Sequence, residues 1–224
     1  QSCNRIAWST KDKTHLVFGT TDGEIGVLNK ETLQTTPFSL LSSAKVSQIV
    51  YNEVYRAVFI SQESQSYLWN LNNNTLTTTP YFTASKGMAI ANDNALLNAS
   101  YDRATLLKNP FSDFRISDKQ LSFQKPRFVS DKVNFKVTNL RMKRAYTCLY
   151  SKDEKVSYVG FVDELIQFDL LGQQTVIRYK NQPVFAIDME ETQDGTLWVS
   201  TFKDGILGIK NQKVIRNYTT ANGL

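Results

Sequence analysis

Short apolar runs recur along the chain, and each is followed by a small or polar residue and then by an acidic turn. The pattern covers residues 15–28, 57–71, 96–107, 157–168 and 197–209. Taking one equivalent position in each copy gives the anchors Gly19, Ile60, Ala99, Gly160 and Ser200. The intervals between these anchors are 41, 39, 61 and 40 residues. A repeat of about 40 residues therefore explains all four intervals, if the third contains an insertion of about 20.

Each repeat contains four short runs with the composition of β-strands, rich in Val, Ile, Thr, Tyr and Phe and bounded by Asn, Asp, Gly and Ser. The runs before the anchors are residues 6–8, 49–51, 88–91, 148–150 and 185–189, and the last runs are residues 33–38, 76–82, 121–129, 176–179 and 214–218. Asp22-Gly23, Asp194-Gly195 and Asp204-Gly205 are the strongest hairpin turns, because glycine adopts positive φ and aspartate bonds its own backbone. No helical stripe with a cap is found, so little or no helix is expected.

Four strands in every repeat predict an all-β fold, a β-propeller with about five four-stranded blades in this chain. We expect a single domain over residues 1–224, with blades at about 1–40, 41–82, 83–129, 140–180 and 181–224, and a basic insertion at 109–144. A β-sandwich also has many short strands, but it does not require a fixed repeat with an acidic turn. Blades stacked around an axis bury each other's faces, which one four-stranded sheet cannot do alone.

The composition agrees with a packed globular protein and excludes several kinds of site. Hydrophobic residues make up 41% of the 224 residues and charged residues 21%. His15 is the one histidine of the sequence, so zinc sites built from several histidines are excluded. Cys3 and Cys148 are too few for a disulfide framework, and Cys148 is expected to be a buried thiol. No cofactor is predicted, and without a run of about 18 apolar residues no membrane contact by this segment is expected.

The net charge of +5 is concentrated in one segment, residues 109–144, which has nine basic and three acidic side chains. Three interpretations of this segment remain open. It can be a solvated insertion, a docking surface for an acidic glycan such as a uronic acid or sulfated chain, or a contact for nucleic acid. No recognised DNA-binding or RNA-binding module accompanies it, so the sequence predicts no nucleic-acid partner.

The last repeat has the strongest motif content: the Asp194-Gly195 turn, the Leu-Trp-Val-Ser-Thr strand at 197–201, the Asp204-Gly205 turn and the ending at 218–224. It resembles the two-component regulator propeller repeats in the periplasmic sensor region of hybrid histidine kinases of gut Bacteroidetes. The first repeat shares the Gly-Thr-Thr-Asp-Gly segment at 19–23. The other repeats lack the tryptophan and most of the glycines.

The resemblance implies a periplasmic input domain, not an enzyme, that binds an oligosaccharide or another small periplasmic ligand and passes the signal to a kinase in a separate region. Its expected partners are this ligand, the remainder of the propeller and a dimer mate. Propellers of that family have more than five blades, so the chain is expected either to be a piece of a larger ring, with two blade faces open, or to close with five. The start at Gln1 without a leader is expected for a mature exported domain or a designed chain.

Propellers usually bind ligands on the face formed by the turns between second and third strands and by the connections between blades. The predicted ligand-binding residues on this face are Tyr101, Phe161, Phe202, Lys203, Arg103, Lys86 and Lys45, with Thr21, Gln62 and Lys180 beside them. Aromatic rings stack on the apolar face of a pyranose, and basic side chains bond its hydroxyl or acid groups. Trp8, Trp69 and Trp198 lie within apolar runs and are expected to pack between blades.

An acidic residue follows every anchor, and the set can be interpreted in two ways. Its members are Asp22, Glu63, Asp102, Asp163 and Asp204. A ring of carboxylates could hold a metal, but aspartate is favoured at turns for backbone reasons alone, so no metal site is predicted. Two alternatives to a sensor remain: a protein-interaction scaffold, and a propeller glycosidase or lyase, which would need two carboxylates facing each other.

Overall fold

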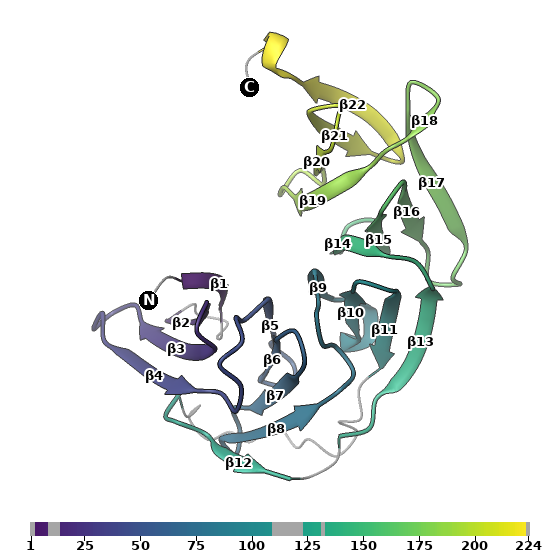
Figure 1. Cartoon of the computed structure of the whole chain (residues 1–224). Helices are drawn as coiled ribbons and strands as arrows, with labels where there is room; N and C mark the ends of the chain where they lie inside the picture. Colours follow the sequence, from purple (N-terminus) through teal and green to yellow (C-terminus); the bar gives the residue numbers. More distant parts are fainter. Residues whose placement is uncertain (1–2, 9–13, 109–122, 131–132, 223–224) are drawn as a thin grey trace. The chain divides into compact units, whose positions relative to one another are not determined.

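The computed structural model describes residues 3–8, 14–108, 123–130 and 133–222, and for residues 3–8 it describes the backbone alone. The chain is all-β, with 55% strand and 3% helix. Its strands form five sheets that follow one another in chain order (Figure 1). Four or five strands per sheet, mostly connected as antiparallel meanders, confirm the predicted propeller blades.

The first two sheets are built from the N-terminal third of the chain and one later strand. The first sheet contains β1 (Cys3–Trp8), β2 (His15–Thr20), β3 (Glu24–Asn29) and β4 (Thr35–Ser39). The second contains β5 (Gln48–Asn52), β6 (Ala57–Ser61), β7 (Ser66–Asn70), β8 (Thr75–Thr79) and β12 (Arg127–Val129). Consecutive strands pair antiparallel, whereas β12 is added parallel to β8.

The remaining strands form three further sheets. The third contains β9 (Gly87–Ile90), β10 (Leu96–Ala99), β11 (Ala104–Lys108) and β13 (Lys136–Arg141). The fourth contains β14 (Ala145–Ser151), β15 (Val156–Phe161), β16 (Leu165–Phe168), β17 (Gln174–Tyr179) and β18 (Gln182–Pro183). The fifth contains β19 (Ala186–Glu191), β20 (Leu197–Thr201), β21 (Ile206–Lys210) and β22 (Lys213–Tyr218). Two short 3₁₀ turns, η1 (Asn92–Asn94) and η2 (Thr220–Asn222), complete the described elements.

The outer strand of the third sheet differs from the prediction. Residues 121–129 were expected to fill this place, but Arg127–Val129 pairs with β8 of the second sheet. The third sheet is completed by Lys136–Arg141, so the basic segment 109–144 ends in a strand of the regular sheet. The outer strand is largely exposed. It therefore lacks the apolar signal that marks the inner strands.

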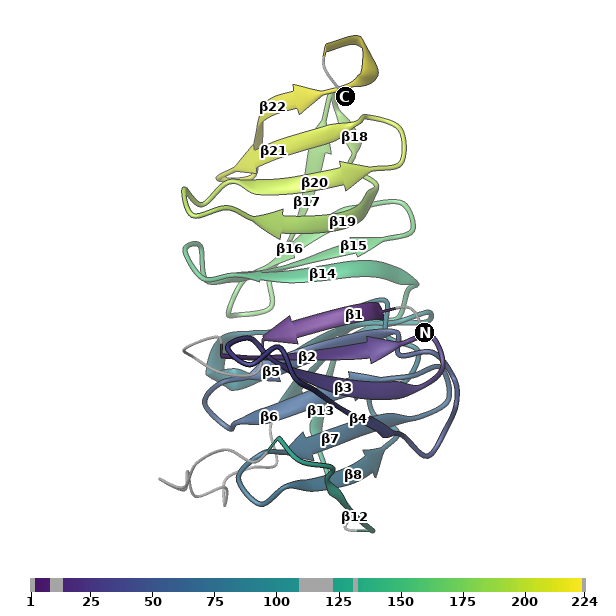
Figure 2. The same cartoon turned by 90° about the vertical axis from the view of Figure 1, so that its left-hand side faces the viewer.

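By their internal contacts the residues group into two compact units, residues 1–85 with 107–136, and residues 86–106 with 137–224. In the N-terminal unit one core cluster joins the first two sheets around Val17, Ile25, Ile60 and Trp69. The C-terminal unit has two clusters, one joining the third and fourth sheets and one joining the fourth and fifth. β14 lies beside β19 within this unit (Figure 2). Each described sheet interface is thus an apolar layer, as expected for stacked blades.

The second repeat is shifted by one residue from the predicted alignment. Ile60 belongs to the cluster that contains Val17 and Ile25, so its side chain faces the first sheet. A Cβ at Gly19 would instead meet Val46, which precedes the second sheet. Phe59, which packs on Phe82 with ring centroids 5.6 Å apart, has the orientation of the other anchors. With Phe59 as the anchor, the intervals become 40, 40, 61 and 40 residues.

The predicted Asp-Gly hairpin turns are confirmed by the backbone. Gly23, Gly195 and Gly205 have φ values of 75°, 73° and 75°. Only glycine adopts this region without steric cost. In the Asp194-Gly195 turn the aspartate carboxylate accepts hydrogen bonds from Thr192 Oγ1 (2.7 Å) and the Thr196 backbone N–H (3.1 Å).

These hydrogen bonds to Thr192 and to Thr196 lower the pKa of Asp194 to about 2. An unfolded aspartate titrates near pH 3.9, roughly the model-peptide value. The turn therefore contributes stability above about pH 4 and loses it as the pH falls through about 2. We expect an Asp194→Ala variant to be less stable than the wild type at pH 6 and to lose most of this difference at pH 2, measured by urea unfolding. An NMR titration of the Asp194 carboxyl carbon with a midpoint near pH 4 would contradict this prediction.

Candidate functional site

The turns and connections of the C-terminal unit meet at one edge of its three sheets. Because the strands are antiparallel, the β10–β11, β15–β16 and β20–β21 turns lie at the same edge as the starts of β14 and β19. Backbone hydrogen bonds fix these segments to one another: Ala145 N donates to Ser100 O (2.9 Å), and Phe202 N donates to Phe185 O (3.1 Å). The side chains at this edge are therefore placed by sheet geometry.

Four aromatic rings and one guanidinium form a continuous row along this edge. The row contains Tyr101, Arg144, Tyr146, Phe185 and Phe202, and we call it the aromatic–arginine row. Arg144 Cζ lies 4.5 Å from the ring centroid of Tyr101 and 4.8 Å from that of Tyr146. The ring of Tyr146 lies 5.6 Å from that of Phe185, which stacks on Phe202 at 5.3 Å with an interplanar angle of 22°. The row thus crosses all three sheets of the unit.

The row is accessible to solvent at both ends and partly enclosed in its middle. Tyr101 is 61% exposed and Phe202 is 72% exposed, whereas Arg144, Tyr146 and Phe185 are half-buried. The pairing register of β14 shifts between Ala145 and Thr147, so a bulge occurs at Tyr146. Bulges at sheet edges redirect a side chain, and here the bulged residue belongs to the row.

The basic side chains beside Arg144 are used in ion pairs. Lys143 Nζ contacts Asp163 Oδ1 and lies 3.0 Å from Glu164 Oε1, and Arg141 Nη2 lies 3.0 Å from the same Glu164 oxygen. Desolvation acts to lower the pKa of Lys143, but the hydrogen bonds to Asp163 and Glu164 outweigh it and leave this pKa raised. The β15–β16 turn is thereby neutralised locally.

Several of the predicted ligand-binding residues are exposed at the expected edge. Tyr101 and Phe202 form the two ends of the aromatic–arginine row. Lys203 follows Phe202 in the β20–β21 turn and is exposed. The structure therefore brings the two aromatic residues into one array.

Phe161 differs from the prediction, whereas Arg103 lies at the expected edge and has an acidic partner. Phe161 is fully buried in the core between the third and fourth sheets, 6.4 Å from the ring of Phe168, so it was wrongly placed on the ligand surface. The side chains of Phe161 and Tyr158 lie on opposite faces of β15, and that of Phe161 points toward the third sheet. Arg103 is paired with Asp102 at 2.6 Å, and this hydrogen bond lowers the pKa of Asp102. The guanidinium is thus already engaged by a neighbouring carboxylate.

The other predicted residues do not join the row. Lys86 is exposed on the connection before β9, and Lys180 lies with its Nζ 5.0 Å from its neighbour's ring, that of Tyr179. Thr21, Gln62 and Lys45 belong to the N-terminal unit. Gln62 is fully buried, and its Nε2 donates to Ser42 O at 3.0 Å, so it was wrongly expected at the ligand surface.

Sequence reasoning missed three members of the row. Arg144 was counted only as part of the basic segment, while Tyr146 and Phe185 were not singled out. One signal was available, because each of these residues precedes or begins the innermost strand of a repeat. That position lies on the edge which the sequence assigned to ligand binding. The contacts between residues of different repeats depend on how the sheets stack, which the sequence pattern does not specify.

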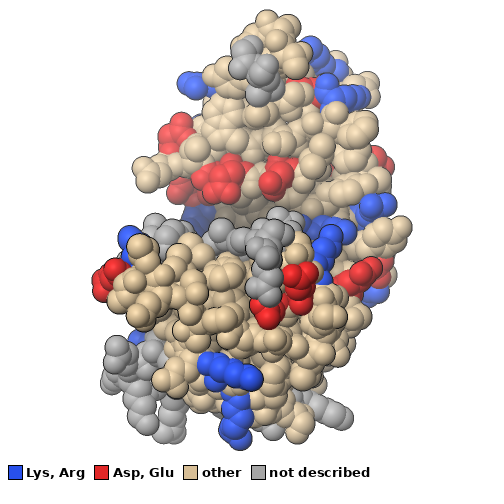
Figure 3. Space-filling model, turned by 60° about the vertical axis from the view of Figure 1, so that its left-hand side comes forward, with Lys and Arg blue, Asp and Glu red and all other residues tan. Residues whose placement is uncertain are grey.

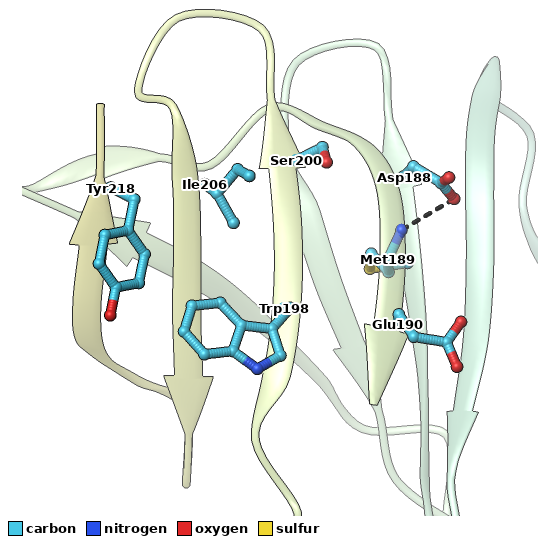
Figure 4. Close-up of a pocket in the computed structure, with 7 residues that line it drawn as sticks. All are labelled: Asp188, Met189, Glu190, Trp198, Ser200, Ile206 and Tyr218. Carbon is cyan, nitrogen blue, oxygen red and sulfur yellow. Dashed lines mark hydrogen bonds between the residues drawn. The ribbon is translucent and has the colours of Figure 1, made fainter. Parts of the chain in front are cut away.

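A separate open depression of about 470 Å³ lies on the face of the fifth sheet (Figure 4). Trp198 and Tyr218 stack there with centroids 5.8 Å apart, beside Ile206. Asp188 and Glu190 are exposed on the neighbouring strand β19. The space-filling view shows acidic side chains gathered on this part of the molecule (Figure 3).

The position of this depression in the repeat explains its apolar lining. Trp198 is equivalent to Tyr158 of the fourth sheet, since each lies two residues before its anchor. Tyr158 is 1% exposed and packs against the fifth sheet. The depression thus lies on the face of the fifth sheet that corresponds to the face with which the fourth sheet packs on the fifth, and its aromatic lining has the character of a packing surface. Trp69 is fully buried as predicted, Trp198 is half-buried, and the side chain of Trp8 lies outside the described residues.

The remaining candidate groups have structural partners. Asp22 and Asp204 have backbone N–H groups that donate to Thr20 and Thr201, as in ordinary turns. Across residues 14–108, 123–130 and 133–222, no group of three or more His, Cys, Asp or Glu side chains is arranged to hold a metal ion. His15 stacks on Phe123 at 4.1 Å. Cys148 is buried, and desolvation raises the pKa of its thiol to about 12, as expected for an unreactive core cysteine.

No family model and no curated protein sequence matches the chain. The similar solved structures include catalytically inactive virginiamycin B lyase from Staphylococcus aureus with quinupristin (TM-score 0.71, 10% identity, 99% of this chain and 71% of that chain). They also include the Swd1 β-propeller domain of Myceliophteria thermophila (0.66, 11%, 100% and 71%). A third is PorZ, an essential surface component of the type-IX secretion system of Porphyromonas gingivalis (0.70, 13%, 97% and 34%).

These likenesses support the β-propeller fold and nothing finer. A lyase, a Swd1 domain and a secretion component share the architecture at 10–13% identity. One fold therefore accommodates unrelated roles, and function must be argued from the residues of this chain. Among its described segments, no helix is long and apolar enough to cross a membrane.

Proposed function

We propose that the chain is a periplasmic ligand-sensing module that binds an oligosaccharide along the aromatic–arginine row. One observation carries the proposal: four aromatic rings are aligned across three sheets, and the rings at both ends are exposed. Exposed rings at the two ends of such a row suit a chain of pyranose units, because each end ring can stack on the apolar face of one sugar. Positions on sheet edges also give such a site a rigid base.

In this proposal the protein binds its ligand without turnover and belongs to a two-component regulator. Ligand binding favours one arrangement of the module relative to a neighbouring domain or a dimer mate. The difference in affinity between two such arrangements then carries the signal to a kinase in a separate region. Resemblance of the last repeat to two-component regulator propellers supports this role, and the likeness to a lyase fold supplies the contrary hypothesis of catalysis.

Replacement of the exposed rings tests the site. We expect Tyr101→Ala and Phe202→Ala each to weaken binding of the recognised oligosaccharide by about tenfold, roughly 1.4 kcal/mol, since each removes one stacking platform. A panel of neutral and acidic oligosaccharides would be screened by isothermal titration calorimetry. Leu171→Ala is the control, because Leu171 is 84% exposed in the β16–β17 turn at the opposite edge of the fourth sheet.

Two results would contradict the proposal. One is that no member of the panel binds, or that both ring variants bind as tightly as the wild type. The other is the appearance of shortened or unsaturated sugar products during incubation, since the module would then be an enzyme. Loss of affinity in the Leu171 control as well would indicate a general defect of folding and not a local site.

A further inference from the structure

Among the described residues Arg144 has no acidic partner, unlike the basic residues beside it. Arg141 and Lys143 are both paired with carboxylates of the β15–β16 turn, and Arg103 is paired with Asp102. Within the described residues Arg144 contacts two tyrosine rings and makes no ion pair. This half-buried cation is thus held in place by rings, and no described carboxylate compensates its charge.

The hydrogen-bonding groups of Arg144 are also unused. Its Nε is enclosed and has no acceptor among the described residues, and it is the one nitrogen of this guanidinium that is enclosed in this way. A guanidinium presents five N–H donors in a planar fork and cannot lose its proton in a protein. Because only Nε is enclosed, the terminal nitrogens stay open to an external acceptor, and their hydrogen bonds to an anion would be charge-assisted.

The surroundings of Arg144 favour an anion. The nearby acids Asp102 and Asp163 are each neutralised by an ion pair with a basic residue. Lys203 adds an exposed positive charge in the turn that carries Phe202, and the half-buried Asp204 offsets part of it. The adjoining aromatic rings lower the local dielectric, which strengthens a charge-assisted hydrogen bond to the guanidinium.

We propose that Arg144 is the specificity-determining residue of the aromatic–arginine row and that it binds the carboxylate of a uronic acid. The inference rests on the proposed function, because it concerns the same row. The planar fork of arginine matches a carboxylate in a bidentate arrangement. The rings of Tyr101 and Tyr146 pack on the guanidinium and so hold it in position for this carboxylate. An acidic oligosaccharide would thus be selected over a neutral one of the same shape.

A matched pair of ligands tests the inference with the whole chain. Tetragalacturonate and its fully methyl-esterified form differ at the carboxyl groups alone, which are anionic in the acid and neutral methyl esters in the other, and calorimetry would measure the affinity of each. We expect the wild type to bind the acid at least about tenfold more tightly than the ester. Arg144→Gln should lose most of this preference by weakening binding of the acid about tenfold or more, with the ester changed by less than about twofold. Arg144→Lys keeps the positive charge but not the planar pair of donors. Its preference for the acid should therefore lie between those of the wild type and of Arg144→Gln.

Arg141→Gln is the matched control, because Arg141 is already paired with Glu164. It should keep the preference of the wild type, and thermal melting would show that every variant is folded. Equal binding of acid and ester by the wild type would overturn the inference and leave the proposed function intact. A folded Arg144→Gln variant that keeps the preference would overturn it as well. If the wild type binds neither of the two ligands and no neutral oligosaccharide of the panel, both proposals are overturned.

Discussion

Replacing Trp69 with alanine is expected to lower the free energy of unfolding by about 3–5 kcal/mol, the range for removing a large aromatic side chain from a core. Trp69 is fully buried between the first two sheets. Its ring lies edge-on to Phe38 at 5.1 Å and to Phe123 at 6.5 Å. Alanine would leave a cavity there, because the close-packed side chains of the surrounding cluster cannot all move inward.

A hydrogen bond adds to the expected loss. Trp69 Nε1 donates to Asn74 Oδ1 at 3.0 Å, and Asn74 Nδ2 donates to Lys125 O at 3.3 Å. Trp69 thereby connects β7 to the segment that precedes β12. Removing the indole leaves the Asn74 carbonyl oxygen without this donor and weakens the attachment of β12 to β8. Faster amide hydrogen exchange at Phe128 and Val129 in the variant would report this second effect.

Trp198→Ala is the matched control, because the same side chain is removed from the exposed face of the fifth sheet. There the indole is half-buried and stacks mainly on Tyr218. We expect a loss of about 1–2 kcal/mol, in line with the smaller apolar area that is buried. Urea unfolding followed by circular dichroism would measure both variants. Equal losses for the two would show that Trp69 does not have the packing role assigned to it.

The sequence predicts the repeat well because each inner strand is a short apolar run bounded by turn residues. The prediction fails where apolar strand residues are no longer set apart from their polar neighbours. β6 and β7 are buried on both faces, so no alternation distinguishes Phe59 from Ile60, and the second anchor was assigned one residue too late. β13 is mostly exposed, so it resembles a loop in the pattern, while the Phe-Val pair of β12 resembles an outer strand.

For the candidate site, the sequence predicts the edge but not which rings meet there. Phe161 and Phe202 both follow their anchors closely. Phe161 is the last residue of β15 and points into the core, whereas Phe202 lies one residue beyond β20 and is exposed. A difference of one position relative to the strand end thus separates a core residue from a surface residue. The contacts of Arg144 with two rings arise from the stacking of sheets, and no local pattern encodes them.

Replacing Gly205 with alanine is expected to cost about 3–4 kcal/mol of stability, at the upper end of single substitutions. Gly205 has φ of 75°, a region that costs L-residues about 1–2 kcal/mol. A Cβ at this position would also collide with the carbonyl oxygen of Tyr218. Because this obstacle is backbone in the paired strand β22, a rotamer change cannot relieve it. The strand itself would have to move, with loss of its register to β21.

Gly172→Ala separates the cost of a positive φ from the cost of the collision. Gly172 has φ of 82° in a hairpin turn, and a Cβ there would meet nothing within 4 Å. It should lose only the conformational part, about 1–2 kcal/mol. Both variants would be compared by urea unfolding. A Gly205→Ala variant no less stable than Gly172→Ala would mean that β22 can move away from the new Cβ without a loss of stability.

The Gly205 substitution should also affect ligand binding, which the Gly172 control should not. Thr201 N and Thr201 Oγ1 both donate to Gly205 O, at 2.9 and 2.7 Å, and so close the turn that carries Phe202. If this turn shifts, Phe202 loses its stacking on Phe185 and the aromatic–arginine row is shortened by one ring. We therefore expect the folded fraction of Gly205→Ala to bind oligosaccharide as weakly as Phe202→Ala. Wild-type affinity in that variant would imply that the position of Phe202 does not depend on the turn.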